Sequence, residues 1–191
     1  MKKVLIFLVI FFGSVTNINA ETNRIISGNN NAKITIIAYE SLTCSHCADF
    51  HKEVYPQLKK EYIDTGLAKI EFRHFPLDIA ALNAAKITQC KQDQSLKILN
   101  SLYSNQQAWV KGNTIDNINE NLKKFLKKEG FIINFKKCVN DKEIEDFVLN
   151  DRIEGVKTFK VNATPTIIIN NKKFEKTLNY KNLKKSLEKL I

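Results

Sequence analysis

The chain has 191 residues and a formal net charge of +10, from 30 lysines and arginines against 20 aspartates and glutamates. This length suits one domain, or one domain with an insertion, and is sufficient to bury a core. Because no nucleic-acid-binding motif is recognisable, we expect solvated lysine-rich helix faces and no nucleic-acid partner. Attraction to an anionic membrane surface is an alternative that the net charge leaves open.

The first twenty residues show the three-part pattern of a secretory signal. Met1–Lys3 is a short basic start, Val4–Phe12 is an unbroken apolar run, and small and polar residues lead to Ala20. The alternative is an uncleaved membrane anchor, but a span needs roughly 20 apolar residues, and this run is much shorter. We therefore predict a signal peptide at 1–20, a mature domain at 21–191, and export to the periplasm, where disulfides persist.

The mature chain begins with a predicted lead-in, strand, helix and second strand. Residues 21–32 are polar, and residues 33–39 are β-branched and apolar, as in a buried strand. Apolar residues recur every fourth position over 50–62, which predicts a helix that Pro56 should kink or divide. Residues 67–75 alternate between apolar and charged, which predicts the second strand.

The middle of the chain, 78–158, is predicted to be almost wholly helical. Apolar residues at three- and four-residue spacings predict helices at 79–91, 94–109, 115–128 and 141–159. Asn140 and Glu143 have the spacing of a capping box at the start of the last one. This stretch is too long for a simple crossover. We predict a helical insertion between two parts, 33–77 and 159–191, of a βαβ…ββα fold.

The C-terminal part contains two more predicted strands and a helix. Residues 166–170 form a strand, Asn170-Asn171 is a turn signal, and 172–175 can return as a short edge strand. Residues 181–191 predict a terminal amphipathic helix. Its inner side is predicted to carry Leu183, Leu187, Leu190 and Ile191.

The most informative motif is Cys44-Ser45-His46-Cys47. Two cysteines at this spacing can close as a disulfide, open to a dithiol or bind a metal. The strand before them, the helix after them and the distant Pro165 before another strand together describe a thiol–disulfide exchange site. The rival from a different class is a copper- or zinc-binding module. Structural zinc sites use four ligands, usually two such pairs, and this chain has one, so we expect no metal and no other cofactor.

The two cysteines have different predicted roles. The thiolate is the attacking species, and Cys44 falls at a helix N-terminus, where unpaired N–H groups and the helix dipole favour an anion. Cys44 is therefore the predicted nucleophile. Cys47, one turn further on, should be more shielded and act as the resolving partner. His46 can add a donor or a positive charge beside the Cys44 sulfur, which lowers the thiol pKa and makes the disulfide more oxidising.

Thr164 and Pro165 supply the predicted substrate side. An X-Pro bond can be cis at modest cost, and a fold usually holds it cis for geometry. A cis bond would turn the Thr164 backbone outward beside the sulfurs, where a substrate strand can pair with it. The alternative is an ordinary proline at the first residue of a strand. The upstream CxxC favours the cis form.

Four separated segments resemble the DsbA-like thioredoxin family in order and spacing: Cys44–His51, Val54–Pro56, Phe72–Asp78 and Ala163–Thr166. The resemblance covers nearly the whole mature chain. It implies an α/β thioredoxin fold, with a central mixed sheet, flanking helices and an inserted all-helical subdomain. It also implies an exported thiol:disulfide oxidoreductase that donates its disulfide to unfolded or newly exported protein thiols. A membrane quinone reductase of the DsbB type would reoxidise it.

The sequence departs from the family pattern in two places. The family commonly carries an acid six residues before the first cysteine, where this chain has Ala38. Glu40 lies on the same strand face and is the candidate proton relay. Thr164 stands where the best-known oxidases carry valine and isomerases carry threonine. Because dimeric isomerases need a separate region before the catalytic domain, and only a short lead-in precedes the first predicted strand, we favour a monomeric oxidase over an isomerase or reductase.

The remaining candidate residues lie outside the motif. Cys90 and Cys138 fall in the helical region. If the motif cysteines pair with each other, one other pairing remains, and the oxidising compartment favours this bridge over two buried free thiols. His51 and His74 are expected to be surface or packing histidines, and Trp109 a core residue.

Overall fold

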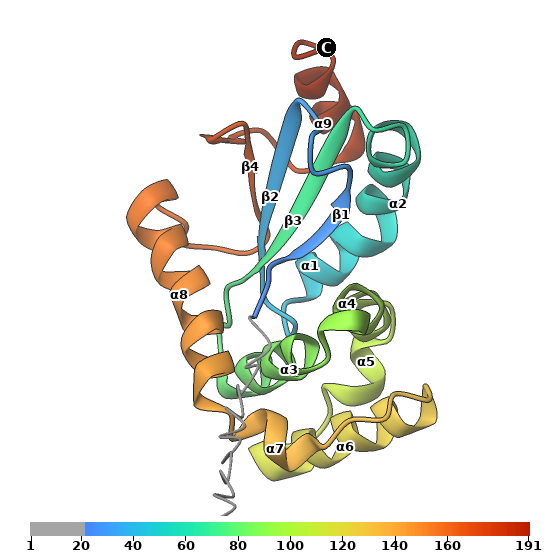
Figure 1. The fold of residues 1–191 in the computed structure, drawn as a ribbon, viewed down its shortest axis with the longest axis vertical. Helices are drawn as coiled ribbons and strands as arrows, with labels where there is room; N and C mark the ends of the chain where they lie inside the picture. Colours follow the sequence, from blue (N-terminus) through green and yellow to red (C-terminus); the bar gives the residue numbers. More distant parts are fainter. Residues whose placement is uncertain (1–21) are drawn as a thin grey trace, which may run out of the picture.

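The computed structural model describes residues 22–191 and shows a central sheet flanked by helices (Figure 1). The predicted signal, residues 1–20, lies outside the described residues. The sheet order is β1-β3-β2-β4-β5, with β2 parallel to β3 and the other neighbours antiparallel. The strands are β1 (Ile25–Gly28), β2 (Ile34–Glu40), β3 (Ala68–His74), β4 (Thr166–Ile169) and β5 (Lys172–Lys173). The predicted α/β fold with a mixed sheet is confirmed.

β2 lies in the middle of the sheet, and both of its faces are buried. Ile36 and Ala38 point into the main core. Ile37 and Tyr39 point into a smaller cluster on the opposite face, against which Phe159 packs. A strand buried on both sides reads as a continuous apolar run, which is the pattern that made it recognisable in the sequence.

β1 replaces part of the lead-in that the sequence predicts as irregular. It pairs antiparallel with β3, with Ile25 opposite Phe72. Ile25 is its single buried apolar side chain, since Ile26 is exposed and the other inward residue is Ser27. Four residues with one buried apolar side chain carry no clear strand period. The open edge of β3 supplies the pairing that the local sequence does not signal.

The helix after the CxxC motif is divided as the proline predicts. α1 (Ser45–Asp49) and α2 (Tyr55–Leu58) are joined by a π-helical turn, Phe50–Val54, and a second π-helical turn, Lys59–Ile63, follows. Pro56 lies in the first turn of α2. The helical backbone continues through Val54 and Tyr55, and the π-helical turn before the proline accommodates its missing N–H.

Most of the helical region gathers at one end of the sheet, and its last helix runs alongside the sheet (Figure 1). Its helices are α3 (Ile79–Cys90), α4 (Ser95–Ser104), α5 (Gln106–Trp109), α6 (Ile115–Lys128), α7 (Phe135–Val139) and α8 (Lys142–Phe159), with a 3-10 turn at Gln92–Gln94. The helix predicted over 94–109 breaks at Asn105, and α7 was not expected. The predicted cap of α8 is also wrong by one residue. Asp141, not Asn140, caps it by accepting a hydrogen bond from the Ile144 N–H at 3.1 Å.

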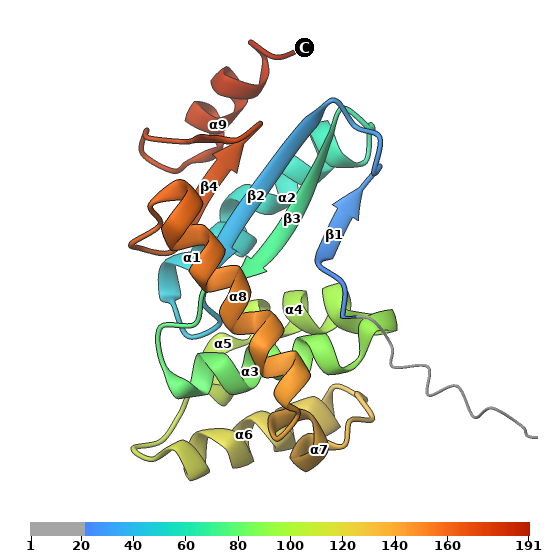
Figure 2. The same ribbon diagram turned by 60° about the vertical axis from the view of Figure 1, so that its left-hand side comes forward.

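α8 runs from the helical region up along one face of the sheet (Figure 2). At its lower end Glu145 accepts a 2.7 Å hydrogen bond from the buried Lys86 of α3. Further along, Gly155 lies directly against the ring of Tyr39, and a Cβ at this position would be 2.7 Å from a ring carbon. The glycine therefore allows the helix to approach β2 closely.

The C-terminal helix α9 (Tyr180–Leu187) is shorter than predicted. Leu183 and Leu187 are fully buried, as expected from their spacing. Leu190 and Ile191 lie beyond the helix and are exposed, so their predicted inner placement is wrong. Among residues 22–191, no helix combines the length and apolar character needed to cross a membrane.

Candidate active site

Cys44 lies where the chain leaves β2 and enters α1. It is the N-cap residue, with extended backbone angles (φ −78°, ψ 120°), and its carbonyl accepts the N–H groups of Cys47 and Ala48 at 3.2 Å. Both motif cysteines are free thiols, Cys44 partly exposed and Cys47 fully buried. The structure therefore holds the pair as a dithiol, with one sulfur open to solvent and the other enclosed.

The structure lowers the pKa of the Cys44 thiol and raises that of the Cys47 thiol. A hydrogen bond from the Cys47 side chain is the largest cause that lowers the pKa of Cys44 to about 5, with further help from the backbone N–H groups of Cys47 and His46. Burial raises the pKa of the Cys47 thiol far above its usual value. At neutral pH, Cys44 is therefore a thiolate and Cys47 a thiol. Unpaired N–H groups at a helix N-terminus have this effect on an anion.

The peptide bond between Thr164 and Pro165 is cis and lies beside the reactive cysteine. As a thiol, Cys44 Sγ donates to the Thr164 carbonyl oxygen at 3.3 Å, across 120 residues of sequence. The loop before β4 thus meets the loop after β2 at one end of the sheet. This contact brings together the nucleophile and substrate-side residues named from the sequence.

In the described structure, the His46 side chain does not supply the donor or positive charge expected beside the Cys44 sulfur. It is 82% exposed, and its Nδ1 lies 3.6 Å from Asp49 Oδ2. The described contact of His46 with the Cys44 sulfur is through its backbone N–H. The residue therefore contributes to the acidity of Cys44 by its position in the first turn of α1.

Glu40 and His51 form a buried pair beneath the motif. Glu40 Oε2 lies 2.9 Å from His51 Nε2, and both side chains are 3% exposed. Tyr103 stacks on the imidazole with 4.1 Å between ring centres. Burial raises the pKa of the Glu40 carboxyl, and His51 opposes this. Glu40 Oε1 is buried without a hydrogen-bond partner, which leaves one oxygen of the pair free to take a proton.

The electrostatic influence of Glu40 reaches both sulfurs. Its charge raises the pKa of Cys47, and the charge of Cys44 raises the pKa of Glu40. The sequence marks Glu40 as a candidate but gives no sign of its pairing with His51. Strand parity identified the face on which Glu40 lies. The histidine comes from a π-helical turn, whose side-chain directions do not follow the four-residue spacing used to predict the helix.

Gln106 is a supporting residue that the sequence did not reveal. From α5, its Nε2 donates to the carbonyls of Leu42 and Cys44, at 2.9 and 3.0 Å. It therefore fixes the loop that presents the nucleophile. No motif marks a single glutamine in a helical region, and its contact depends on how the helices pack against the sheet.

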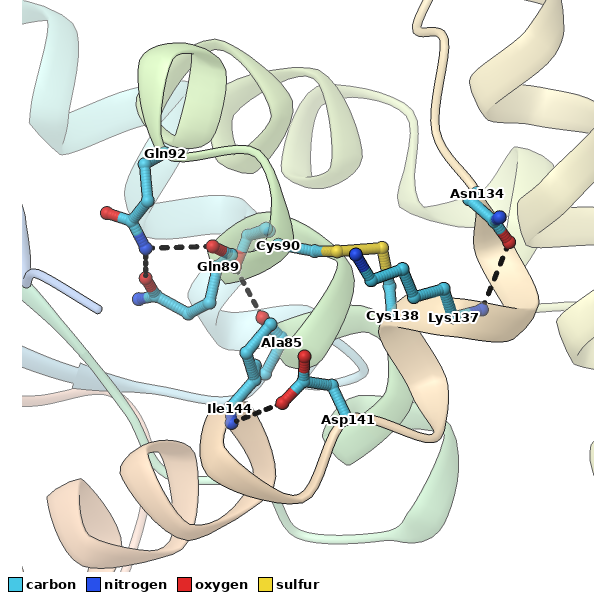
Figure 3. The surroundings of a disulfide bond; sticks show 10 residues. Ala85, Gln89, Cys90, Gln92, Asn134, Lys137, Cys138, Asp141 and Ile144 are labelled. Atoms are coloured by element: carbon cyan, nitrogen blue, oxygen red, sulfur yellow. Dashed lines mark hydrogen bonds between the residues drawn. A yellow bond between two sulfur atoms is a disulfide. The ribbon is translucent and has the colours of Figure 1, made fainter. Parts of the chain in front are cut away.

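Cys90 and Cys138 form a disulfide in the helical region (Figure 3). The bond joins the last residue of α3 to α7, with 5.6 Å between the Cα atoms. Asp141 follows α7 and caps α8, so the bridge anchors the chain just before the long helix (Figure 3).

Two other residues named from the sequence lie in the interior. Trp109 is fully buried and donates its Nε1–H to the Leu102 carbonyl at 3.0 Å. His74 is buried beside Thr88 and Gln89, and burial lowers its pKa to about 4. In the part of the chain from residue 22 onward, no group of three or more His, Cys, Asp or Glu side chains is placed to hold a metal ion.

Comparison with known proteins decides the family. A family model described as Thioredoxin matches residues 20–189. Among solved structures, alpha-DsbA1 from Wolbachia pipientis has a TM-score of 0.78 and 31% sequence identity, over 88% of this chain and 90% of that chain. The chain belongs to the DsbA-like thioredoxin family. The resemblance found in the CxxC and proline segments is confirmed, and so is the thioredoxin fold.

The curated relatives carry names of the same kind. A Rickettsia prowazekii protein, provisionally named protein-disulfide oxidoreductase, is 27% identical over 177 residues, which is 90% of this chain and 62% of the relative. Disulfide bond formation protein D from Bacillus subtilis is 24% identical over 172 residues, 85% of this chain and 74% of that protein. The chain thus spans about three-fifths of the length of the Rickettsia relative.

Proposed function

We propose that this DsbA-like protein is an exported, monomeric protein-disulfide oxidase of the periplasm. The observation that carries the proposal is the contrast between the acidic, partly exposed Cys44 and the buried, weakly acidic Cys47. A hydrogen-bonded thiolate stabilises the reduced state, and a stabilised reduced state makes the disulfide a stronger oxidant. Unfolded or newly exported protein thiols are the proposed substrates, and a membrane quinone reductase of the DsbB type is the proposed reoxidising partner.

The proposed reaction runs through one mixed disulfide. A substrate thiolate attacks the Cys44 sulfur of the Cys44–Cys47 disulfide, and Cys47 leaves with the electron pair and takes a proton. A second substrate thiolate attacks the substrate sulfur of the mixed disulfide, and Cys44 leaves as a stabilised thiolate. The substrate dithiol has then become a disulfide, and the protein disulfide a dithiol. The carbonyl of Thr164, presented by the cis bond to Pro165, is the proposed pairing site for the substrate backbone.

The Glu40–His51 pair is the proposed proton store for Cys47. Cys47 must gain a proton each time it leaves and lose one each time it attacks, and it is enclosed from solvent. The free Oε1 of Glu40 is the proposed acceptor. Glu40→Gln should slow the resolving step by about 10²-fold at neutral pH, the lower end of the range for general acid–base catalysis. Glu143→Gln, an exposed position at the start of α8, is the control. Equal resolving rates in the two variants would refute the relay.

The oxidase proposal is tested with a reduced dithiol peptide and the oxidised protein. Cys44→Ala should abolish peptide oxidation, because no sulfur remains that a substrate can reach. Cys47→Ala should instead accumulate a mixed disulfide when presented with a disulfide-bonded peptide, because only the released peptide thiol, and no longer Cys47, can attack it. Retained peptide oxidation in the Cys44 variant would overturn the mechanism. Metal analysis of the reduced protein addresses the rival binding module, since tight stoichiometric metal without exchange activity would favour that rival.

A further inference from the structure

A hollow of about 300 Å³ adjoins the reactive site on the proline side of α1. Its apolar lining comes from Phe50, Val54, Pro165 and Leu178. Pro165 is bonded to Thr164, whose carbonyl touches Cys44. The hollow therefore lies next to that carbonyl, with apolar surface available for the side chains of a segment bound there.

The polar part of the hollow is negatively charged in a strongly basic protein. Asp49 and Glu53 both line it, are both exposed and lie four residues apart. Asp49 has a 3.6 Å contact to His46, the remaining polar lining residue. Over residues 22–191, Glu53 makes no ion pair. The +10 chain thus presents two carboxylates beside its reactive sulfur, with at least one of them unpaired.

We propose that this hollow makes the protein selective for substrate cysteines flanked by lysine or arginine. This inference rests on the proposed oxidase function and names the substrate class of the same site. Asp49 and Glu53 attract the cationic side chains, and the apolar lining accepts their methylene stems, which long basic residues bury along apolar surface. Acidic flanks meet the same carboxylates and are repelled.

The hollow on the other side of α1 supplies a contrast. It is larger, about 580 Å³, and is lined mainly by uncharged polar residues of α4 and α5, together with Lys52 and Asp49. A substrate passing through it would meet one charge of each sign and would have no contact with Pro165. Lys52 and Glu53 are neighbours in sequence and both exposed, and each lines one of the two hollows, so their variants form a matched pair.

The test compares two dithiol peptides of equal length whose cysteines are flanked by lysine in one and by glutamate in the other. The rate of each with oxidised glutathione corrects for its own thiol reactivity. At low ionic strength the corrected preference for the lysine peptide should be about three- to tenfold, from one or two exposed charge pairs. Glu53→Gln should reduce it by about two- to fivefold, Lys52→Gln should not reduce it, and about 1 M salt should abolish it.

Equal corrected rates for the two peptides would overturn the charge selectivity and leave the oxidase function standing. A preference that changes in Lys52→Gln and not in Glu53→Gln would place the substrate in the other hollow and also overturn it. Failure to oxidise either peptide would refute the oxidase function, and this inference with it. Because the readout is a ratio between peptides, a general effect of either variant on Cys44 cancels.

Discussion

Replacing Cys47 by alanine should raise the pKa of Cys44, because the Cys47 side chain is the largest cause of its acidity. Serine at the same position keeps a hydrogen-bond donor and should preserve most of the effect. The backbone N–H groups of residues 46 and 47 remain in both variants. We therefore expect the pKa of Cys44 to rise in the order wild type, Cys47→Ser, Cys47→Ala, with the alanine variant still below about 8.5, the value of an unperturbed cysteine.

The same acidity sets how the stability of the reduced protein depends on pH. The folded pKa of Cys44 is about 5, below its unfolded value, so the stabilisation is fully present above about 8.5 and is lost as the pH falls through 5. The folded pKa lies two units below pH 7, so ionisation of Cys44 contributes about 2.7 kcal/mol of stability at that pH, at 1.36 kcal/mol per unit. Since Cys44 is partly exposed, solvent screening reduces this, and we expect about 1 kcal/mol.

Thiolate absorbance in the ultraviolet, followed against pH, measures the pKa of Cys44 in all three proteins. The rate of alkylation by iodoacetamide against pH is an independent check. Denaturation of the reduced and oxidised proteins at pH 5 and pH 8 measures the stability difference, which should move in favour of the reduced form at the higher pH. A wild-type pKa near 8.5 would show that the site does not acidify Cys44, and an alanine variant with the wild-type pKa would show that the Cys47 hydrogen bond is not the cause.

Three further variants test the framework around the site. Removing both Cys90 and Cys138 should lower the free energy of unfolding by about 4 kcal/mol in the chain-entropy model for a 48-residue separation, and a loss below about 1 kcal/mol would contradict this. Gly155→Ala places a Cβ against the buried ring of Tyr39 and should cost about 1–3 kcal/mol in urea denaturation, whereas an unchanged midpoint would show that α8 moves freely. Gln106→Ala removes two hydrogen bonds to the loop of the reactive cysteine and should cost about 1–2 kcal/mol and slow peptide oxidation, which a neutral variant would disprove.

The sequence predicted those parts of the molecule in which local pattern and tertiary structure agree. β2 is a continuous apolar run because both of its faces are buried, and Pro56 divides the helix because it has no N–H to donate. Cys44 was placed at a helix N-terminus from the change of period after the strand. In each case a few neighbouring residues contain the physical cause.

The remaining features depend on contacts between distant segments. β1 forms because the edge of β3 is open to it, although its own four residues show little apolar period. Gln106 reaches the reactive loop only because α5 packs beside it. The Glu40–His51 pair required a π-helical turn that aims the imidazole at β2, and no residue spacing announces such a turn.

The reduction potential of the Cys44–Cys47 couple is the most direct test of whether the protein is an oxidase. The purified protein is equilibrated with defined ratios of reduced and oxidised glutathione, and its reduced fraction is measured after thiol trapping. The Cys90–Cys138 bridge is removed in a parallel sample, so that only the motif contributes. We expect an oxidising potential, above about −200 mV, because the Cys44 thiolate stabilises the reduced form. A potential at or below about −270 mV, the value of thioredoxin, would contradict it.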